Sequence, residues 1–167
     1  FLPGAADIRA PRQVQADYDL IVALDASSID RLGDVYHEGK HAGIPLAVID
    51  HHSTNTYYGT VNWVEAGCAA TCQMLVYLAD ALGITLSPPL AECLLTGIVT
   101  DTRCFRTSNT TPAVLEAAMR LQETGANLPA LVQRTLNRMP YSTLKLWGLV
   151  LPEARLEDGV LWVGVRR

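Results

Sequence analysis

Residues 49–55 read Ile49-Asp50-His51-His52-Ser53-Thr54-Asn55, and the organisation of the chain is clearest when read outward from this stretch. The run that leads into it, Ile44 to Ile49 (IPLAVI), is apolar throughout apart from a proline near its start. Such a run predicts a short strand that is buried on both faces. Open α/β sheets carry their chemistry at the carboxyl ends of their strands. The carboxylate and the two imidazoles that end this strand are therefore candidates for a functional site.

A second apolar run lies upstream and also ends in a carboxylate. Tyr18 to Asp25 (YDLIVALD) predicts a strand that ends at Asp25. Between the two runs, Ile29 to Ala42 has apolar residues at three- and four-residue spacing, which predicts one helix that Gly43 ends. Strand, helix and strand in this order predict a βαβ unit with parallel strands. We therefore expect Asp25 and Asp50 to lie at the same edge of the sheet.

Further elements complete an α/β fold in which helices flank a parallel sheet. A third carboxylate, Asp101, lies where the apolar helix after Pro88-Pro89 ends. The pattern predicts a short edge strand within 57–63, helices over 69–82, 90–99 and 112–125, and two further short helices over 128–138 and 141–150 that act as linkers. Residues 152–158 are predicted to be a charged loop, and 159–167 resemble the start of a strand. We expect residues 1–150 to form one domain and 151–167 to be a linker and the start of a second domain.

Composition excludes several classes of protein. The chain has 167 residues, 49% of them apolar and 18% charged, which is typical of a globular domain with its own core. The net charge of −4 provides no basic surface for duplex DNA, so a nucleic-acid ligand should be short. No apolar run of about 18 residues predicts a membrane span, and no signal peptide is visible. Cys68, Cys72, Cys93 and Cys104 are interpreted as reduced core thiols of a cytoplasmic protein.

Five side chains could together hold a metal ion: Asp25, Asp50, His51, His52 and Asp101. Each alone is equally compatible with a turn, a helix cap or an ordinary polar surface. As a set, carboxylates and imidazoles suit Mn²⁺, and Mg²⁺ less well. The cysteines show no pattern of ligands that would indicate a structural zinc site. Two ions roughly 3.5–4 Å apart would need a bridging carboxylate, and Asp25 is well placed for that role.

These residues resemble the motifs of the DHH phosphoesterase superfamily. Residues 49–55 are similar to its central motif, and Leu24-Asp25 is similar to the motif that precedes it. Residues 97–102 (GIVTDT), followed by Phe105, Asn109 and Thr110, are similar to the last motif. Within the superfamily, the chain looks most like the bacterial oligoribonuclease and pAp-phosphatase group, where pAp is 3′-phosphoadenosine 5′-phosphate.

The resemblance implies a site for two Mn²⁺ ions, with Mg²⁺ as an alternative. By this resemblance Asp25 bridges the ions, His51 ligates one of them and Asp101 shares in the coordination of that ion. His52 faces the substrate phosphate, and Asp50 orients an imidazole from behind. The implied substrates are short single-stranded RNA and pAp.

The chain departs from the family pattern in two places. The family's first strand and its His/Asp/Asp motif would lie before Phe1, and the family's second, smaller domain would follow Arg167. We therefore expect this chain to be a fragment that folds but has weak activity or none. Arg103 stands where the family often has glycine. Arg103 and Arg106 are candidates for contacts with phosphate, although solvated surface arginines are the favoured interpretation.

Several functions remain in competition. The first is a Mn²⁺-dependent phosphohydrolase and exoribonuclease that acts on short oligoribonucleotides and pAp. Alternatives are a phosphodiesterase for cyclic or linear dinucleotides, and a non-catalytic nucleotide-binding domain. A purely structural domain would require Asp25, His51 and Asp101 to be coincidental. We expect no contact with duplex DNA or a membrane, and a homodimer is left open.

Overall fold

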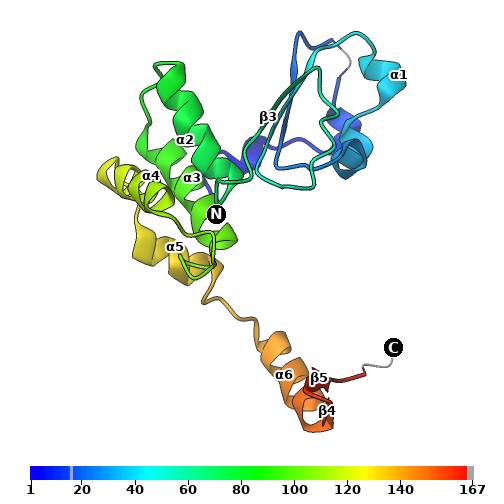
Figure 1. Ribbon diagram of the computed structural model, residues 1–167, viewed down its shortest axis with the longest axis vertical. Coiled ribbons are helices and arrows are strands. Elements are labelled where there is room, and N and C mark those ends of the chain that lie inside the picture. The colour runs from blue at the N-terminus through cyan, green and yellow to red at the C-terminus, as the bar shows by residue number, and fades with distance from the viewer. Residues whose placement is uncertain (16, 165–167) are drawn as a thin grey trace.

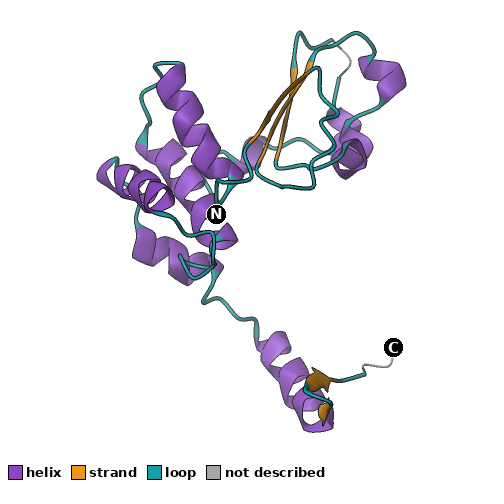
Figure 2. Ribbon diagram, viewed as in Figure 1, coloured by secondary structure: helices purple, strands orange, loops and turns teal. Residues whose placement is uncertain are grey.

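The computed structural model describes residues 1–15 and 17–164, which form three parts along the chain. A small sheet comes first, a group of helices follows, and a last helix with a hairpin extends away from both (Figures 1 and 2). Two short 3-10 turns, Ala5–Asp7 and Pro11–Gln13, precede the sheet.

The sheet has three parallel strands in the order β1 (Ile21–Leu24), β2 (Leu46–Asp50) and β3 (Val61–Val64). This confirms the predicted α/β fold with a parallel sheet flanked by helices. β1 and β2 are shorter at their beginnings than the predicted strands, and the first ladder bond runs from the Ile21 amide to the Pro45 carbonyl, at 2.9 Å. The ladder continues past β1, because the Asp25 amide donates to the Ile49 carbonyl at 3.0 Å. The ends of β1 and β2 are therefore in register.

The connection from β2 to β3 contains no helix. Residues 51–60 make the whole crossover, which is short for two parallel strands. Gly59 allows this tight path, because a Cβ atom there would lie 2.7 Å from the Val48 side chain and 2.8 Å from the Leu46 carbonyl oxygen. The crossover is the segment that carries His51 and His52, so it is held close against the carboxyl end of the sheet.

The predicted helix over 29–42 is wrong as a single element. The structure has a 3-10 segment, Ile29–Val35, and a separate short helix, α1 (Glu38–His41). Gly33 interrupts the first segment with φ 53° and ψ −142°, a conformation that glycine adopts without steric cost. Tyr36 and His37 then take extended conformations, so the apolar spacing that suggested one helix is divided between two.

Different groups of side chains cover the two faces of the sheet. On one face, Ala23, Leu46 and Val48 pack with Leu32 and Tyr36 of the connecting segment. On the other, Ile49 packs with Met74 of the first long helix. β2 is accordingly buried along its length except at Ala47, which is partly exposed.

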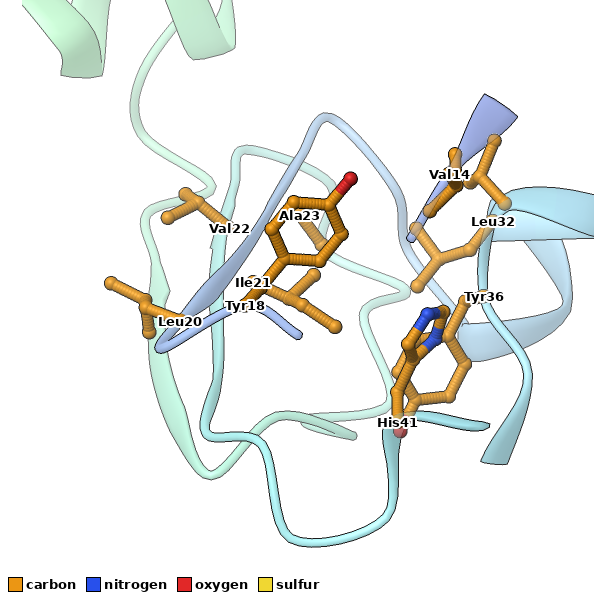
Figure 3. Close-up of a pocket in the computed structure, with 10 residues that line it drawn as sticks. Val14, Tyr18, Leu20, Ile21, Val22, Ala23, Leu32, Tyr36 and His41 are labelled. Carbon is orange, nitrogen blue, oxygen red and sulfur yellow. The ribbon is translucent and has the colours of Figure 1, made fainter. Parts of the chain in front are cut away.

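β1 is less well covered than β2. Among the described residues β1 pairs only with β2, and its side chains Val22 and Leu24 are close to half exposed. A groove of about 280 Å³ follows its free edge, lined by Val14, Tyr18, Leu20, Ile21, Val22, Ala23, Leu32, Val35, Tyr36 and His41. Figure 3 shows Leu20 and Val22 on the opposite side of this strand from Tyr36 and His41.

Four helices form the largest core: α2 (Thr71–Ala81), α3 (Pro88–Asp101), α4 (Pro112–Glu123) and α5 (Leu128–Thr135). α2 and α3 approach so closely at Gly97 that any Cβ atom there would collide with the Cys72 side chain. A hydroxyl group caps the beginning of α4, because Thr111 Oγ1 accepts from the Val114 amide at 3.4 Å. This packing places the end of α3, with Asp101, beside the beginning of α2.

The C-terminal part is a helix and a hairpin: α6 (Tyr141–Val150), a 3-10 turn (Leu151–Glu153), and the antiparallel pair β4 (Arg155–Glu157) and β5 (Val160–Trp162). The prediction of a loop over 152–158 is wrong for β4. Asp158-Gly159 forms a turn in which both residues have positive φ, the signature of a tight hairpin. The predicted strand over 159–167 is present at 160–162, and residues 165–167 lie outside the described residues. No helix of the described part is long and apolar enough to cross a membrane.

Candidate metal centre

Asp25 lies at the turn that follows β1. Its backbone is left-handed, with φ 60°, and about half of its side chain is exposed. Thr71, the first residue of α2, donates from Oγ1 to Asp25 Oδ1 at 2.9 Å. This bond holds the carboxylate at the junction between the sheet and the helices.

His51 presents one defined nitrogen to the centre. Its Nδ1 lies 3.2 Å from the Cys68 carbonyl oxygen, which can only accept a hydrogen bond. Nδ1 therefore carries the proton in the neutral ring, and Nε2 has a free lone pair. A backbone carbonyl that fixes the tautomer in this way is the usual support of a metal-binding histidine.

Two carboxylates face this free nitrogen. Asp25 Oδ1 lies 3.5 Å and Asp101 Oδ2 lies 3.7 Å from His51 Nε2. The structure thus brings together three of the residues singled out from the sequence, from β1, the end of β2 and the end of α3.

Asp50 lies behind the centre and not within it. Its side chain is fully buried, and it accepts hydrogen bonds from His52 Nδ1 at 2.7 Å and from Asn55 Nδ2 at 2.6 Å. Burial by itself would raise the pKa of Asp50, but the hydrogen bonds from Asn55 and His52 outweigh it and hold that pKa below the ordinary value. Asp50 is therefore an anion that orients the His52 ring.

Asn55 joins this network to the Asp25 turn. Its Nδ2 also donates to the Ala26 carbonyl at 3.2 Å, which accepts from Tyr58 Oη at 3.0 Å as well. Its Oδ1 accepts from the Tyr57 amide at 2.7 Å. One side chain thus links the loop after β2 to the residue that follows Asp25.

The environment of Asp101 raises the pKa of its carboxyl, whereas that of Asp50 lowers it. Burial, and then the negative charge of Asp25, raise the pKa of Asp101, and the two histidines offset this in part. The carboxylates of Asp25 and Asp101 therefore repel one another across His51. A cation between them would relieve that repulsion.

The donor set fits a divalent cation. One ligand atom each from Asp25, His51 and His52 lie within 4.8 Å of one another, and Asp101 adds a fourth group beside His51. The His52 atom near Asp25 is Nδ1, at 3.9 Å, and it already donates to Asp50. We therefore regard Asp25, His51 and Asp101 as the better ligand set, with His52 left free at Nε2. Oxygen and imidazole ligands of this kind suit Mn²⁺ and Mg²⁺.

The cysteine thiols are not ligands of this centre. All four cysteines are free thiols, as predicted, but the predicted core position is wrong for Cys93 and Cys104, which are partly exposed. Burial, followed by the charges of Asp101 and Asp25, raises the pKa of the nearby Cys72 to about 12. Cys72 thus stays protonated at neutral pH and is unsuited to bind a metal ion as a thiolate.

Arg103 and Arg106 lie elsewhere. They line a separate cavity with residues of α5, and neither guanidinium pairs with a carboxylate of the centre within the described part of the chain. Sequence reasoning also missed Thr71, the Cys68 carbonyl and Tyr58 as supports of the centre. Thr71 gave a weak signal, as a hydroxyl residue at the start of a helix after two alanines, whereas a backbone carbonyl leaves none.

Comparisons with known proteins indicate the family of the chain. Residues 4–98 match the family model described as DHH family, N-terminal domain. The chain is 37% identical, over 163 residues, to the bifunctional oligoribonuclease and PAP phosphatase NrnA of Thermus thermophilus, covering 98% of this chain and 48% of that protein. It is 28% identical to the protein of the same name from Bacillus subtilis, covering 89% of this chain and 47% of the other.

A solved structure shows the same fold. An exopolyphosphatase-related protein from Bacteroides fragilis superposes with a TM-score of 0.84 at 24% identity, over 95% of this chain and 49% of that one. The chain thus spans about half the length of the curated relatives described above.

Proposed function

This chain belongs to the DHH family, and on that premise we propose that it provides the metal-holding part of a phosphoesterase that hydrolyses short oligoribonucleotides and 3′-phosphoadenosine 5′-phosphate. The observation that carries the proposal is that a carboxylate oxygen of Asp25 and one of Asp101 lie 3.5 Å and 3.7 Å from His51 Nε2. The relatives named oligoribonuclease and PAP phosphatase supply the substrate class.

Asp25, His51 and Asp101 would hold the ions, with Mn²⁺ as the proposed metal and Mg²⁺ as the alternative. When bound, such ions neutralise charge on a phosphate and activate water. Thr71 keeps Asp25 Oδ1 directed into the centre, and the Cys68 carbonyl keeps the lone pair of His51 there. These two supports fix the ligands before any ion arrives, which is the condition for a pre-organised site.

His52 has a different role in this proposal. Asp50 accepts the Nδ1 proton, so the ring has a fixed orientation and its Nε2 is available for substrate. The side chain is 41% exposed, compared with 15% for His51, so it can meet a phosphate oxygen that enters from solvent.

We also propose that the free edge of β1 pairs with a further strand that brings the remaining acidic ligands. Three residues are few for two ions, and about half of the Asp25 side chain is exposed. The apolar groove along β1 (Figure 3) has the shape and lining that a neighbouring strand would cover. Residues 151–167 would then be a linker and the start of a second domain. On this basis residues 1–167 alone have weak activity and bind about one Mn²⁺ tightly.

The substrate class and the cellular location are part of the same proposal. The substrate would be short single-stranded RNA or a nucleotide, without contact to duplex DNA or membranes, in the cytoplasm. The alternatives are a phosphodiesterase for cyclic or linear dinucleotides and a non-catalytic nucleotide-binding domain. The incomplete ligand set favours the non-catalytic alternative for residues 1–167 taken alone. A homodimer stays a prediction.

The test compares residues 1–167 with the complete reading frame that encodes them. Both are assayed with Mn²⁺ on pAp, a ribodinucleotide and a cyclic dinucleotide, and their metal content is measured. We expect hydrolysis of pAp and the dinucleotide by the complete protein and little by residues 1–167. A complete protein that binds nucleotide but hydrolyses none of these would support the non-catalytic alternative. Equal turnover by the two proteins would refute the proposal that further ligands are needed.

A further inference from the structure

A cavity of about 620 Å³ lies at the end of α3, apart from the metal centre, and is lined by Thr100, Arg103, Cys104, Arg106, Val132, Leu136 and Asn137. Its volume is in the range of pockets that hold small organic ligands. Thr100 directly precedes Asp101, and Arg103 follows it by two residues. The cavity is therefore lined by close sequence neighbours of Asp101, whose carboxylate lies beside His51 in the metal centre.

The cavity combines positive charge with an apolar wall. The wall is formed by Val132 of α5 and by Leu136, which directly follows that helix. Within residues 1–15 and 17–164, neither Arg103 nor Arg106 forms an ion pair, whereas Arg120 and Arg134 do. Guanidinium groups are well suited to bind phosphate through paired hydrogen bonds. Charge beside an apolar wall is the combination that a nucleotide requires.

The backbone at Arg103 is unusual. Arg103, Cys104 and Phe105 all have positive φ, at 47°, 60° and 60°. Surrounding bonds hold this conformation: Thr102 is fully buried and its Oγ1 accepts from the Phe105 amide at 2.9 Å, and the Cys104 amide donates to the Val99 carbonyl at 2.8 Å. Glycine would adopt the conformation of Arg103 at lower cost. An arginine at such a position is strained, and strain of this kind gathers at sites that bind ligands.

A simpler role for Arg103 would be to neutralise the negative end of the α3 dipole. That role requires only a positive charge near the last turn, and an arginine outside the strained segment would serve it equally. It also gives no reason for the cavity. The two accounts differ in one respect: only a ligand site makes Arg103 discriminate between anions.

Resting on the proposed function, we propose that this cavity is a nucleotide subsite, in which Arg103 binds the phosphate next to the one that reacts, with Arg106 in support and the sugar and base against Val132 and Leu136. Arg103 is then a residue that determines specificity for substrates with more than one phosphate. Thr102, which is buried below the loop, keeps it in position.

The test is a binding experiment in which the metal centre takes no part. Residues 1–167 are titrated with pAp and with 3′-AMP by calorimetry in EDTA, so that only the 5′-phosphate differs. We expect tighter binding of pAp. Arg103→Gly should weaken pAp binding by about 10- to 100-fold, the scale of a lost bond between charged partners, and leave 3′-AMP binding nearly unchanged. Arg103→Lys keeps the charge and should retain part of the preference.

The matched control is Arg138→Ala, which removes an exposed arginine near this cavity but not in its lining. It should leave the preference for pAp intact, and the thermal midpoint of Arg103→Gly should not fall, because the strain is relieved. An unchanged preference in a folded Arg103→Gly protein, or equal losses in Arg103→Gly and Arg138→Ala, would overturn the subsite. Equally tight binding of inorganic pyrophosphate would overturn the nucleotide part. Hydrolysis is measured separately, so a complete protein that hydrolyses nothing but shows the expected preference refutes the proposed function alone.

Discussion

Two neighbouring clusters of side chains differ in how their polar groups are paired. The inner network consists of Asp50, His52 and Asn55, together with the Ala26 carbonyl, and its buried polar atoms are joined by hydrogen bonds of 2.6–3.2 Å. The outer cluster consists of Asp25, His51 and Asp101, whose facing atoms are 3.5–3.7 Å apart. The inner network is complete by itself, whereas in the outer cluster two carboxylates face one imidazole nitrogen.

The pKa values follow this difference. Hydrogen bonds hold the pKa of Asp50 below its ordinary value despite burial, while burial and the charge of Asp25 raise the pKa of Asp101. A buried acid that is already satisfied gains nothing from a metal ion, so Asp50 serves as a support. An acid that is destabilised by its neighbour gains from a cation. The comparison thus separates the residues that shape the site from those that hold its ligand.

The largest effect is expected from the outer cluster. Asp25→Ala in the complete protein should lower turnover by at least about 10²- to 10³-fold, the scale on which electrostatic stabilisation of a reaction acts. It should also lower the Mn²⁺ content, because Asp25 faces His51 at the centre. His52→Ala should lower turnover but keep more metal, since its Nδ1 is bonded to Asp50. Turnover and metal content are measured together, and equal metal loss in the two variants would contradict this division of roles.

A medium effect is expected from the inner network. Asn55→Ala leaves one oxygen of the fully buried Asp50 unpaired and removes the hydrogen bond from Asn55 to the Ala26 carbonyl. The free energy of unfolding should therefore fall by about 1–3 kcal/mol. Turnover should fall about 10- to 100-fold, as for other groups that support metal ligands from behind. Urea unfolding and turnover measure the two effects.

The control for Asn55 is Thr54→Ala. Thr54 is exposed and lies in the same loop, so its loss should change stability by less than about 0.5 kcal/mol. Equal losses of stability in the two variants would show that the network does not hold the loop.

The smallest effect is expected from Asp101→Asn, and the direction in which it shifts the thermal midpoint is the informative result. Because the folded pKa of Asp101 is raised, the stability linked to this group is present below its unfolded pKa and is lost as the pH rises through its folded pKa. In EDTA at pH 7, Asp101→Asn should therefore unfold at a slightly higher temperature than the unmodified chain. The difference should disappear below about pH 4, where the carboxyl is protonated in both states. A lower midpoint for Asp101→Asn at pH 7 would show that Asp101 is already stabilised without a cation.

Much of the sheet could be predicted from the sequence, because uninterrupted apolar runs before Asp25 and Asp50 have few solutions other than buried parallel strands. The break in the helix predicted over 29–42 could not be predicted, because the spacing of apolar residues gives no information on the positive φ of Gly33. The hairpin at 155–162 did carry a local signal, Asp158-Gly159, which the charged composition of the segment obscured.

The sequence by itself determined which chemistry is available: carboxylates and imidazoles at the ends of apolar runs, with no cysteine pattern to compete for a metal. Only the tertiary structure decided how that chemistry is divided. His51 and His52 are neighbours of the same type, but Cys68, 17 residues after His51, sets the tautomer of one, and Asp50 occupies a nitrogen of the other. Likewise, Asp101 joins the centre only because α3 packs closely on α2 at Gly97. Such roles depend on hydrogen bonds and packing between segments that are distant in the chain, and no local pattern of residues encodes them.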